Sequence, residues 1–474
     1  MISEDARTFT KYSNLLPPSH STVCLIMPFF KYGYHTSALN QLQAVLTCKI
    51  ADETTPVYYG LPTCIPMSDT TFSVVTSMFT VGGFFGSLFS NIIMDRYGRK
   101  GASRLSAALT AAGAALFGLS ASVGPLILGR FLVGLAAGLG ICLCPIYLSE
   151  IAPARIKGNL GVLTQLAIVI GIMVTQGMGF GLATPRQWRV VLFISSGISI
   201  LQYFISPFIV ESPSYLNRKG LVDQHKSAIH SLWGESDDLS RTDPEEQDSE
   251  EPLLSDSDST PERLLIGRQS AVTIPQLLAS PELRRPLLTI VFIMTSQQIS
   301  GINAVLYYSN DILSKSLPEL ASYVSLAITI VNFFMTFPPI FLIEASVRVG
   351  RRQLIQLSVA GALLSHLAVG YGLNSGFVTL SSIAITTFVM SFAIGLGPIP
   401  FVIIPEVAPF HAVSAISSVG LSLNWSVNFF VGLTFLPLRN FLANGDPMKE
   451  GRVFYLFAAV LFCSTFCFSR LYRG

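Results

Sequence analysis

The sequence predicts an all-α membrane protein with twelve transmembrane helices. Half of its 474 residues are hydrophobic, only 12% are charged, and the mean hydropathy is +0.55. These values exclude an ordinary soluble globule. About twelve apolar runs reach the roughly 20 residues that a helix needs to cross a bilayer. The net charge of +2, without a basic patch, gives no sign of a nucleic-acid partner; the lipid bilayer is the expected surrounding.

The basic residues predict the orientation of the chain in the membrane. Residues 1–20 are polar and carry no signal-peptide pattern, so we expect a cytosolic N-terminal tail and a first span that stays in place. Loops rich in Lys and Arg remain on the cytosolic side. This rule places both termini, including the short tail 471–474, in the cytosol. The basic clusters occur in every second loop, at residues 96–104, 155–157, 218–219, 284–285 and 348–352.

The first predicted span, residues 21–46, contains His35. Three interpretations of this side chain stay open: a neutral hydrogen-bonding group, a titratable proton site, or a packing residue. An unperturbed histidine titrates at about pH 6.5. Proton coupling through His35 would therefore suit a membrane that faces an acidic lumen.

Cys48 and Cys64 differ from the other cysteines because both fall in the first outward loop. An oxidising compartment would permit a disulfide there, and two unpaired thiols are the alternative. Most of the seven cysteines lie in predicted spans, where cysteine behaves as a small hydrophobe. No Cys or His spacing indicates a metal site, and we expect no cofactor.

Residues 297–309 place several polar side chains inside an apolar run of membrane-spanning length. An unpaired amide in hydrocarbon costs roughly 2–7 kcal/mol, so such groups face the protein interior, a water-filled path or a ligand. On a regular helix Gln298 and Asn303 would point roughly 140° apart. They face one cavity only if the helix loosens near Gly301, which has the backbone freedom to do so.

An acidic segment divides the chain into two halves. Between residues 235 and 262 there are twelve acidic residues and one basic residue, a composition that cannot bury enough apolar surface to order itself. We therefore expect residues 216–284 to be a cytosolic linker that is disordered in part. It joins a six-helix bundle at residues 21–215 to a second one at residues 285–470.

Residues 297–309 also resemble the seventh helix of the facilitative hexose transporters, in the sugar porter family of the major facilitator superfamily. The resemblance covers nearly the whole chain outside residues 220–270, and the first helix looks most like fungal vacuolar-type members. It implies two pseudo-symmetric six-helix halves, with the substrate held between them at mid-membrane. The residues that it assigns to substrate binding are Gln165, Ile168, Gln297, Gln298, Asn303, Asn332 and Trp425.

The same resemblance assigns gating roles around the site. Tyr307 and Tyr308 would close over the sugar, and Pro398 and Pro400 would break the tenth span, since proline removes backbone hydrogen bonds. Phe401 stands where glucose transporters of the family have tryptophan. Ala393 replaces their glutamate, so glucose itself is in question as the substrate.

Charged residues at the helix ends resemble the family's conformational network. The loop at residues 95–100 carries the superfamily signature, and residues 349–352 repeat it in the second half. Glu150 and Glu406 mark a second pair of corresponding positions. By resemblance the network consists of Asp95, Arg96, Arg99, Arg130, Glu150, Arg155, Glu211, Arg351, Arg352 and Glu406.

Together these features predict transport of a neutral, hexose-like monosaccharide by alternating access. No carboxylate falls at mid-membrane, which favours facilitated diffusion over proton symport. We expect the protein to function as a monomer. Proton-coupled transport of a sugar or polyol through His35 is one alternative, and a sugar sensor that transports nothing is another. No set of nucleophile, base and oxyanion donors indicates an enzyme. An intracellular, vacuolar membrane is favoured over the plasma membrane.

Overall fold

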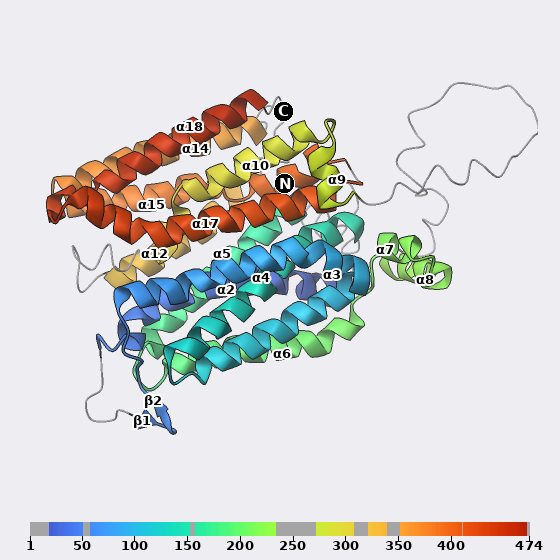
Figure 1. Cartoon of the computed structure of the whole chain (residues 1–474), viewed down its shortest axis with the longest axis horizontal. Coiled ribbons are helices and arrows are strands. Elements are labelled where there is room, and N and C mark those ends of the chain that lie inside the picture. The colour runs from blue at the N-terminus through green and yellow to red at the C-terminus, as the bar shows by residue number, and fades with distance from the viewer. Residues whose placement is uncertain are drawn as a thin grey trace, which may run out of the picture.

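The long helices of the protein lie side by side in two stacked bundles (Figure 1). The computed structural model describes residues 19–50, 57–151, 157–233, 272–307, 321–338, 351–409 and 411–471. The lower bundle in Figure 1, blue to green, is the N-terminal half, and the upper bundle, yellow to red, is the C-terminal half. The acidic segment 235–262, for which the sequence predicts disorder, lies outside the described residues.

The N-terminal half contains six crossings in five continuous helices. The long helix α3 folds back at Gly98, whose φ of 74° and ψ of −178° are non-helical. The parts of α3 before and after Gly98 both pack along α4: residue 82 lies against residue 131, and residue 113 lies against residue 129. The helices are α2 (Ser19–Leu46), α3 (Asp69–Gly118), α4 (Val123–Ile151), α5 (Lys157–Leu182) and α6 (Trp188–Ile205), followed by η2 (Ser206–Phe208).

The C-terminal half repeats this count with two interrupted helices. After α10 ends, the chain turns at Gly301 and returns to helix up to Tyr307. A second interruption separates α15 from α16 at residues 395–398, next to the predicted Pro398 and Pro400. The helices are α10 (Arg284–Ile299), α12 (Ala321–Met335), α14 (Arg351–Asn374), α15 (Val378–Ile394), α16 (Ile399–Val407), α17 (Val413–Ala443) and α18 (Arg452–Leu471), with η5 (Pro447–Lys449) before α18.

The helix inventory agrees with the predicted fold class. Among the described residues, nine helices are long and apolar enough to cross a membrane, with α3 counted once. Since α3 supplies two crossings, and α2 and the shorter apolar helix α12 supply one each, the described helices account for twelve.

The two ends of the bundle differ in chemistry. At one end, called here the disulfide end, Cys48 is bonded to Cys64. The hairpin of β1 (Val57–Tyr58) and β2 (Leu61–Pro62) lies there, and Arg189 donates to the carbonyl oxygens of Gly118, Ser120 and Pro62. At the other end, the arginine end, lie Arg99, Glu150 and the short helices α7 (Pro213–Arg218), α8 (Val222–Trp233) and α9 (Ile274–Ala279) (Figure 1).

Helices α2 and α5 approach each other closely because glycine stands at their contact. A Cβ atom on Gly33 would lie 1.9 Å from the carbonyl oxygen of Ile168, and one on Gly171 would lie 2.1 Å from that of Phe30. Small residues permit such backbone contact between membrane helices. The contact fixes where α5 presents Gln165 and Ile168 toward the centre of the molecule.

We expect Gly33→Ala to destabilise the protein, because backbone must move to admit the methyl group. Overpacking of this kind costs about 1–3 kcal/mol. The matched control is Gly177→Ala on α5, where an added Cβ meets no atom within 4 Å. Thermal unfolding in detergent should show a lower Tm for Gly33→Ala alone, and equal Tm values for the two variants would contradict the close contact.

Candidate functional site

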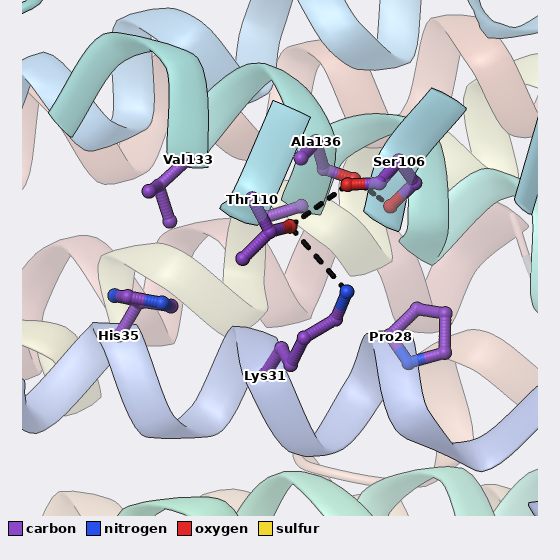
Figure 2. Close-up of a pocket in the computed structure, with 8 residues that line it drawn as sticks. Pro28, Lys31, His35, Ser106, Thr110, Val133 and Ala136 are labelled. Atoms are coloured by element: carbon purple, nitrogen blue, oxygen red, sulfur yellow. Dashed lines mark hydrogen bonds between the residues drawn. The ribbon is translucent and has the colours of Figure 1, made fainter. Parts of the chain in front are cut away.

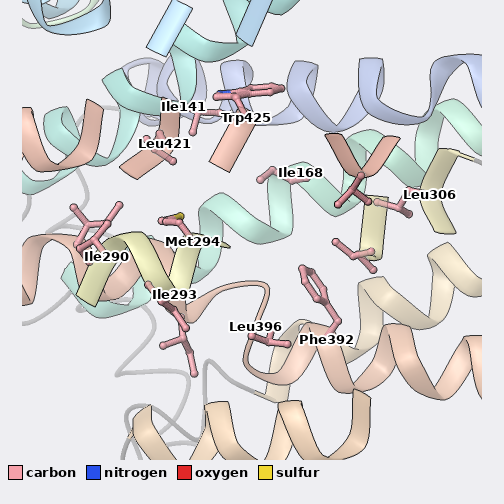
Figure 3. Packing of buried hydrophobic residues seen from close by; sticks show 14 of the residues in the cluster. Ile141, Ile168, Ile290, Ile293, Met294, Leu306, Phe392, Leu396, Leu421 and Trp425 are labelled. Atoms are coloured by element: carbon pink, nitrogen blue, oxygen red, sulfur yellow. The ribbon is translucent and has the colours of Figure 1, made fainter. Parts of the chain in front are cut away.

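A cavity lies between the two halves. Its lining is apolar and amide-rich and, among the described residues, contains no carboxylate, Lys, Arg or His. Figure 3 shows part of the apolar wall, with Ile141, Ile168 and Trp425 on one side and Phe392 on the other. The lining residues are Tyr32, Thr36, Ile141, Gln165, Ile168, Ile172, Gln297, Gln298, Ile302, Asn303, Leu306, Asn332, Phe392, Phe401, Leu421, Asn424 and Trp425.

The break in α10 brings Gln298 and Asn303 together. Gly301 adopts a φ of 80°, in the left-handed region that suits glycine. Across the turn, Asn303 Nδ2 donates a hydrogen bond to Gln298 Oε1. These two amides would diverge on a regular helix, so the predicted loosening at Gly301 is confirmed.

Asn424 of α17 connects the amides of α10. Its Nδ2 donates to Gln297 Oε1 at 2.9 Å and to the Met294 carbonyl oxygen at 3.1 Å, and its Oδ1 accepts from Gln298 Nε2 at 2.9 Å. Gln297 Nε2 in turn donates to the carbonyl oxygens of Leu396 and Gly397, at 2.9 and 3.0 Å. Those carbonyls are available because the chain is not helical between α15 and α16. The amides therefore form one continuous network along the C-terminal wall.

Hydrogen-bonding groups on the rest of the lining remain available to a guest. Asn332 of α12 is 3% exposed, and its Oδ1 has no hydrogen-bond partner within the described part of the chain. Gln165 of α5 faces the cavity from the N-terminal half. Trp425 lies edge-on to Tyr32 and Phe79, with ring centroids 5.5 Å apart in each pair. The cavity thus combines amides with an aromatic wall.

The residues predicted to gate the site lie in different surroundings. Phe401 lines the cavity, and Pro398 and Pro400 stand at the start of α16, where the missing proline N–H groups are tolerated. Tyr307 is buried and donates from its hydroxyl to Asn428 Oδ1 at 3.2 Å. Tyr308 lies outside the described residues.

His35 faces away from the cavity, into the core of the N-terminal half (Figure 2). Its Nε2 lies 2.6 Å from Ser195 Oγ. Lys31, one turn earlier on α2, reaches Thr110 Oγ1 at 3.4 Å. Arg130 Nη1 donates to the His35 carbonyl oxygen at 2.9 Å. Three basic side chains therefore share one buried region.

Arg130 lies apart from the other residues of the predicted charge network. Arg130 lies twenty residues before Glu150 on α4, which at 1.5 Å per residue is about 30 Å along the helix. Its guanidinium instead packs over the Phe79 ring, 5.0 Å from the centroid. The sequence shows that residue 130 is an arginine, but it does not show where the side chain lies. The position of Arg130 deep in the bundle depends on how α2 and α3 pack against α4.

Two other clusters at the arginine end do join predicted residues. Arg99 binds Glu150 through two hydrogen bonds, at 2.6 and 2.8 Å. Glu211 accepts the backbone N–H of Arg99 at 2.8 Å and of Lys100 at 3.1 Å, which secures the turn at Gly98. Burial raises the pKa of the Glu211 carboxyl. In the C-terminal half, Arg351 forms an ion pair with Glu406.

The remaining members of the predicted network are less tightly held. Asp95 pairs loosely with Arg218 at 4.0 Å, and both side chains are exposed. Arg96 packs over Tyr97, and Arg352 is exposed. Arg155 lies outside the described residues. Ion pairs of this exposed kind contribute little to stability.

Comparison with known proteins identifies the family. The profile described as "Sugar (and other) transporter" matches residues 21–471. The chain belongs to the sugar transporter family. A probable metabolite transport protein of Saccharomyces cerevisiae is 31% identical over 448 residues, covering 93% of this chain and 89% of that protein. Facilitated glucose transporter member 1 of solute carrier family 2 from Gallus gallus is 34% identical over 425 residues, covering 86% and 82%.

A solved structure confirms the fold of this family member. The proton:xylose symporter XylE of the major facilitator superfamily, bound to 6-bromo-6-deoxy-D-glucose, superposes with a TM-score of 0.71 and covers 94% of each chain. At 16% sequence identity, this likeness establishes the fold alone. The protein is an integral membrane protein with the twelve-helix major facilitator fold, as the sequence predicted.

Several cavity residues are absent from the set that the sequence predicted. Asn424 holds the network together. Its sequence context could have indicated this role, because it is an amide next to Trp425 in an apolar span. Tyr32 and Thr36 line the cavity from α2, and Ile141 and Ile172 line it from α4 and α5. The two isoleucines carry no signal, since they resemble any other buried aliphatic residue.

We expect Asn424→Ala to destabilise the folded protein. The change leaves Gln297 Oε1 and Gln298 Nε2 without their partners, at about 1–3 kcal/mol for each buried group. Asn332→Ala is the matched control, because Asn332 Oδ1 has no protein partner to lose among the described residues. Thermal unfolding without ligand should lower the Tm of Asn424→Ala well below that of Asn332→Ala, and the reverse order would refute the network.

Proposed function

We propose that the protein carries a neutral monosaccharide, hexose-like in size, across a membrane by alternating access. The observation that carries this proposal is the uncharged, amide-lined cavity between the two halves. Amides both donate and accept hydrogen bonds, as sugar hydroxyls do. The rings of Trp425, Phe392 and Phe401 offer apolar surfaces for the C–H faces of a sugar. A zwitterion or an anion would find no charge to pair with.

Contacts between the halves on both sides of the cavity support alternating access. Toward the disulfide end, Asn40 Nδ2 donates to Ser325 Oγ at 3.4 Å, and Phe180 lies against Tyr323. Toward the arginine end, the hydroxyls of Ser90 and Ser418 are 3.3 Å apart. We infer that transport breaks one set of contacts while the other persists. Substrate favours the exchange only through different contacts in the two states.

In this proposal, the charge clusters at the arginine end hold the helices of each half together. Arg99 and Glu150 lie within the N-terminal half, and Arg351 and Glu406 lie within the C-terminal half. Each pair ties together helices of its own half. The pairs therefore keep each half rigid as it rocks against the other, in the manner of domain motions about an interface.

Facilitated diffusion is the mode that the site supports best. The cavity lining contains no carboxylate among the described residues, and His35 does not face it. A proton on His35 would place a third positive charge near Lys31 and Arg130. Proton coupling through His35 remains the second candidate, because the ring is buried and bonded to Ser195. A sensor would bind sugar without moving it.

We propose that the arginine end faces the cytosol and the disulfide end faces an oxidising compartment, consistent with the basic loops and with the Cys48–Cys64 bond. A vacuolar membrane is the proposed location, and the monomer is the proposed functional unit. The two six-helix halves of one chain enclose the cavity without a second copy.

We expect the purified protein in proteoliposomes to take up a labelled hexose, with competition among hexoses, pentoses and inositol naming the substrate. Gln165→Ala and Asn332→Ala should each raise the KM by about tenfold, the effect of losing one good hydrogen bond. Gln224→Ala, on the exposed surface of α8, is the matched control and should leave the KM unchanged. Sugar binding without flux would replace the carrier by a sensor.

Imposed pH gradients decide the mode of transport. Wild type and His35→Asn should show the same sugar flux at every gradient, and neither should accumulate sugar above the external concentration. Accumulation that follows the proton gradient in wild type and disappears in His35→Asn would establish coupling and overturn facilitated diffusion.

A further inference from the structure

We propose that His366 is a positioning residue that maintains the break in α10 and so holds the amides of the cavity in their converging arrangement. His366 lies on α14, and it is absent from the cavity lining. Its importance for transport rests on the proposed function, whereas its effect on the break does not.

The geometry of the ring fixes its chemical role. His366 is 1% exposed, and its Nε2 lies 2.9 Å from the carbonyl oxygen of Ser300. A carbonyl oxygen only accepts, so Nε2 carries the hydrogen and donates it. The ring packs among Phe388, Phe454 and Phe457, with centroids 4.5, 6.0 and 6.4 Å away. Nδ1 has no hydrogen-bond partner within the described residues, so the ring makes one directed contact.

The Ser300 carbonyl needs this donor because of the break. In a regular helix it would accept from the N–H of Ala304, four residues later. Here the helical turn after the break begins with the bond from Val305 N–H to the Gly301 carbonyl, at 3.1 Å. The Ser300 carbonyl therefore stands outside the helical ladder in the described segment 284–307. A buried carbonyl without a donor is unfavourable, and His366 removes that penalty.

Loss of the His366 hydrogen bond would change the cavity by changing the backbone at Gly301. Without the His366 donor, the chain regains a partner for Ser300 by closing the regular helix through Gly301. Gln298 and Asn303 would then point roughly 140° apart, and their hydrogen bond would be lost. His366 thus acts on the cavity without lining it, because it stabilises the broken form of α10 over the regular helix.

Three variants separate the hydrogen bond from simple packing. His366→Leu keeps an apolar side chain of similar bulk but removes the donor, whereas His366→Gln supplies an amide N–H near the Nε2 position. Ser365→Ala is the matched control on the same helix, because Ser365 Oγ is buried without a partner in the described structure. Equilibrium binding and exchange kinetics with the transported sugar give the Kd, KM and kcat of each.

We expect His366→Leu to raise the sugar Kd and KM on the order of tenfold, the effect of one lost buried hydrogen bond. His366→Gln should recover most of this affinity, and Ser365→Ala should match wild type. Wild-type affinity in His366→Leu would overturn the proposal. So would equal losses in the Leu and Gln variants at unchanged Tm, because packing would then explain the effect.

A measurement without sugar tests the break itself. The paired substitution Gln298→Cys/Asn303→Cys should form a disulfide under mild oxidation, detected by peptide mass mapping, only while the break holds the two positions together. Adding His366→Leu should abolish the bond, and adding His366→Gln should preserve it. Equal bonding in all backgrounds would overturn the proposal. Bonding that depends on His366, together with a wild-type protein that binds no sugar, would sustain the role of His366 in the break and refute the proposed function instead.

Discussion

The structure depends on how buried amides are satisfied at membrane depth. An unmated amide there costs roughly 2–7 kcal/mol, and a regular helix offers it no backbone partner. The two interruptions, at Gly301 and between Ile394 and Ile399, solve this problem together. The first turns Asn303 toward Gln298, and the second releases the carbonyls that Gln297 binds. Irregular backbone is tolerated because it borders a cavity inside protein.

The surrounding helices hold this arrangement without adding charge to it. Close contact between α2 and α5 at Gly33 presents one wall, and α17 presents Asn424 and Trp425 from the other half. Strong ion pairs are kept at the arginine end, where Arg99 meets Glu150. This separation leaves the cavity lining without charge among the described residues, as the proposed neutral substrate requires.

Helical period and residue type predict much of this fold, because twelve apolar runs and the glycine turns are local signals. Gly301 illustrates the point: two amides that diverge on a regular helix can share one cavity only if the helix breaks between them. Such local signals do not predict hydrogen-bond partners that lie far apart in the chain. Asn424 meets Gln298 across 126 residues, and His366 meets Ser300 across 66. The surroundings of Arg130 could not be predicted for the same reason, since they come from α2 and α3 packing against α4.

The central claim is that a sugar takes the place of water against these amides, and a structure determined with a saturating monosaccharide tests it most directly. We expect sugar hydroxyls within hydrogen-bonding distance of Gln165, Asn303 and Asn332, with a ring face against Trp425 or Phe401. Sugar bound elsewhere, or a cavity closed by the amides pairing among themselves under those conditions, would contradict it.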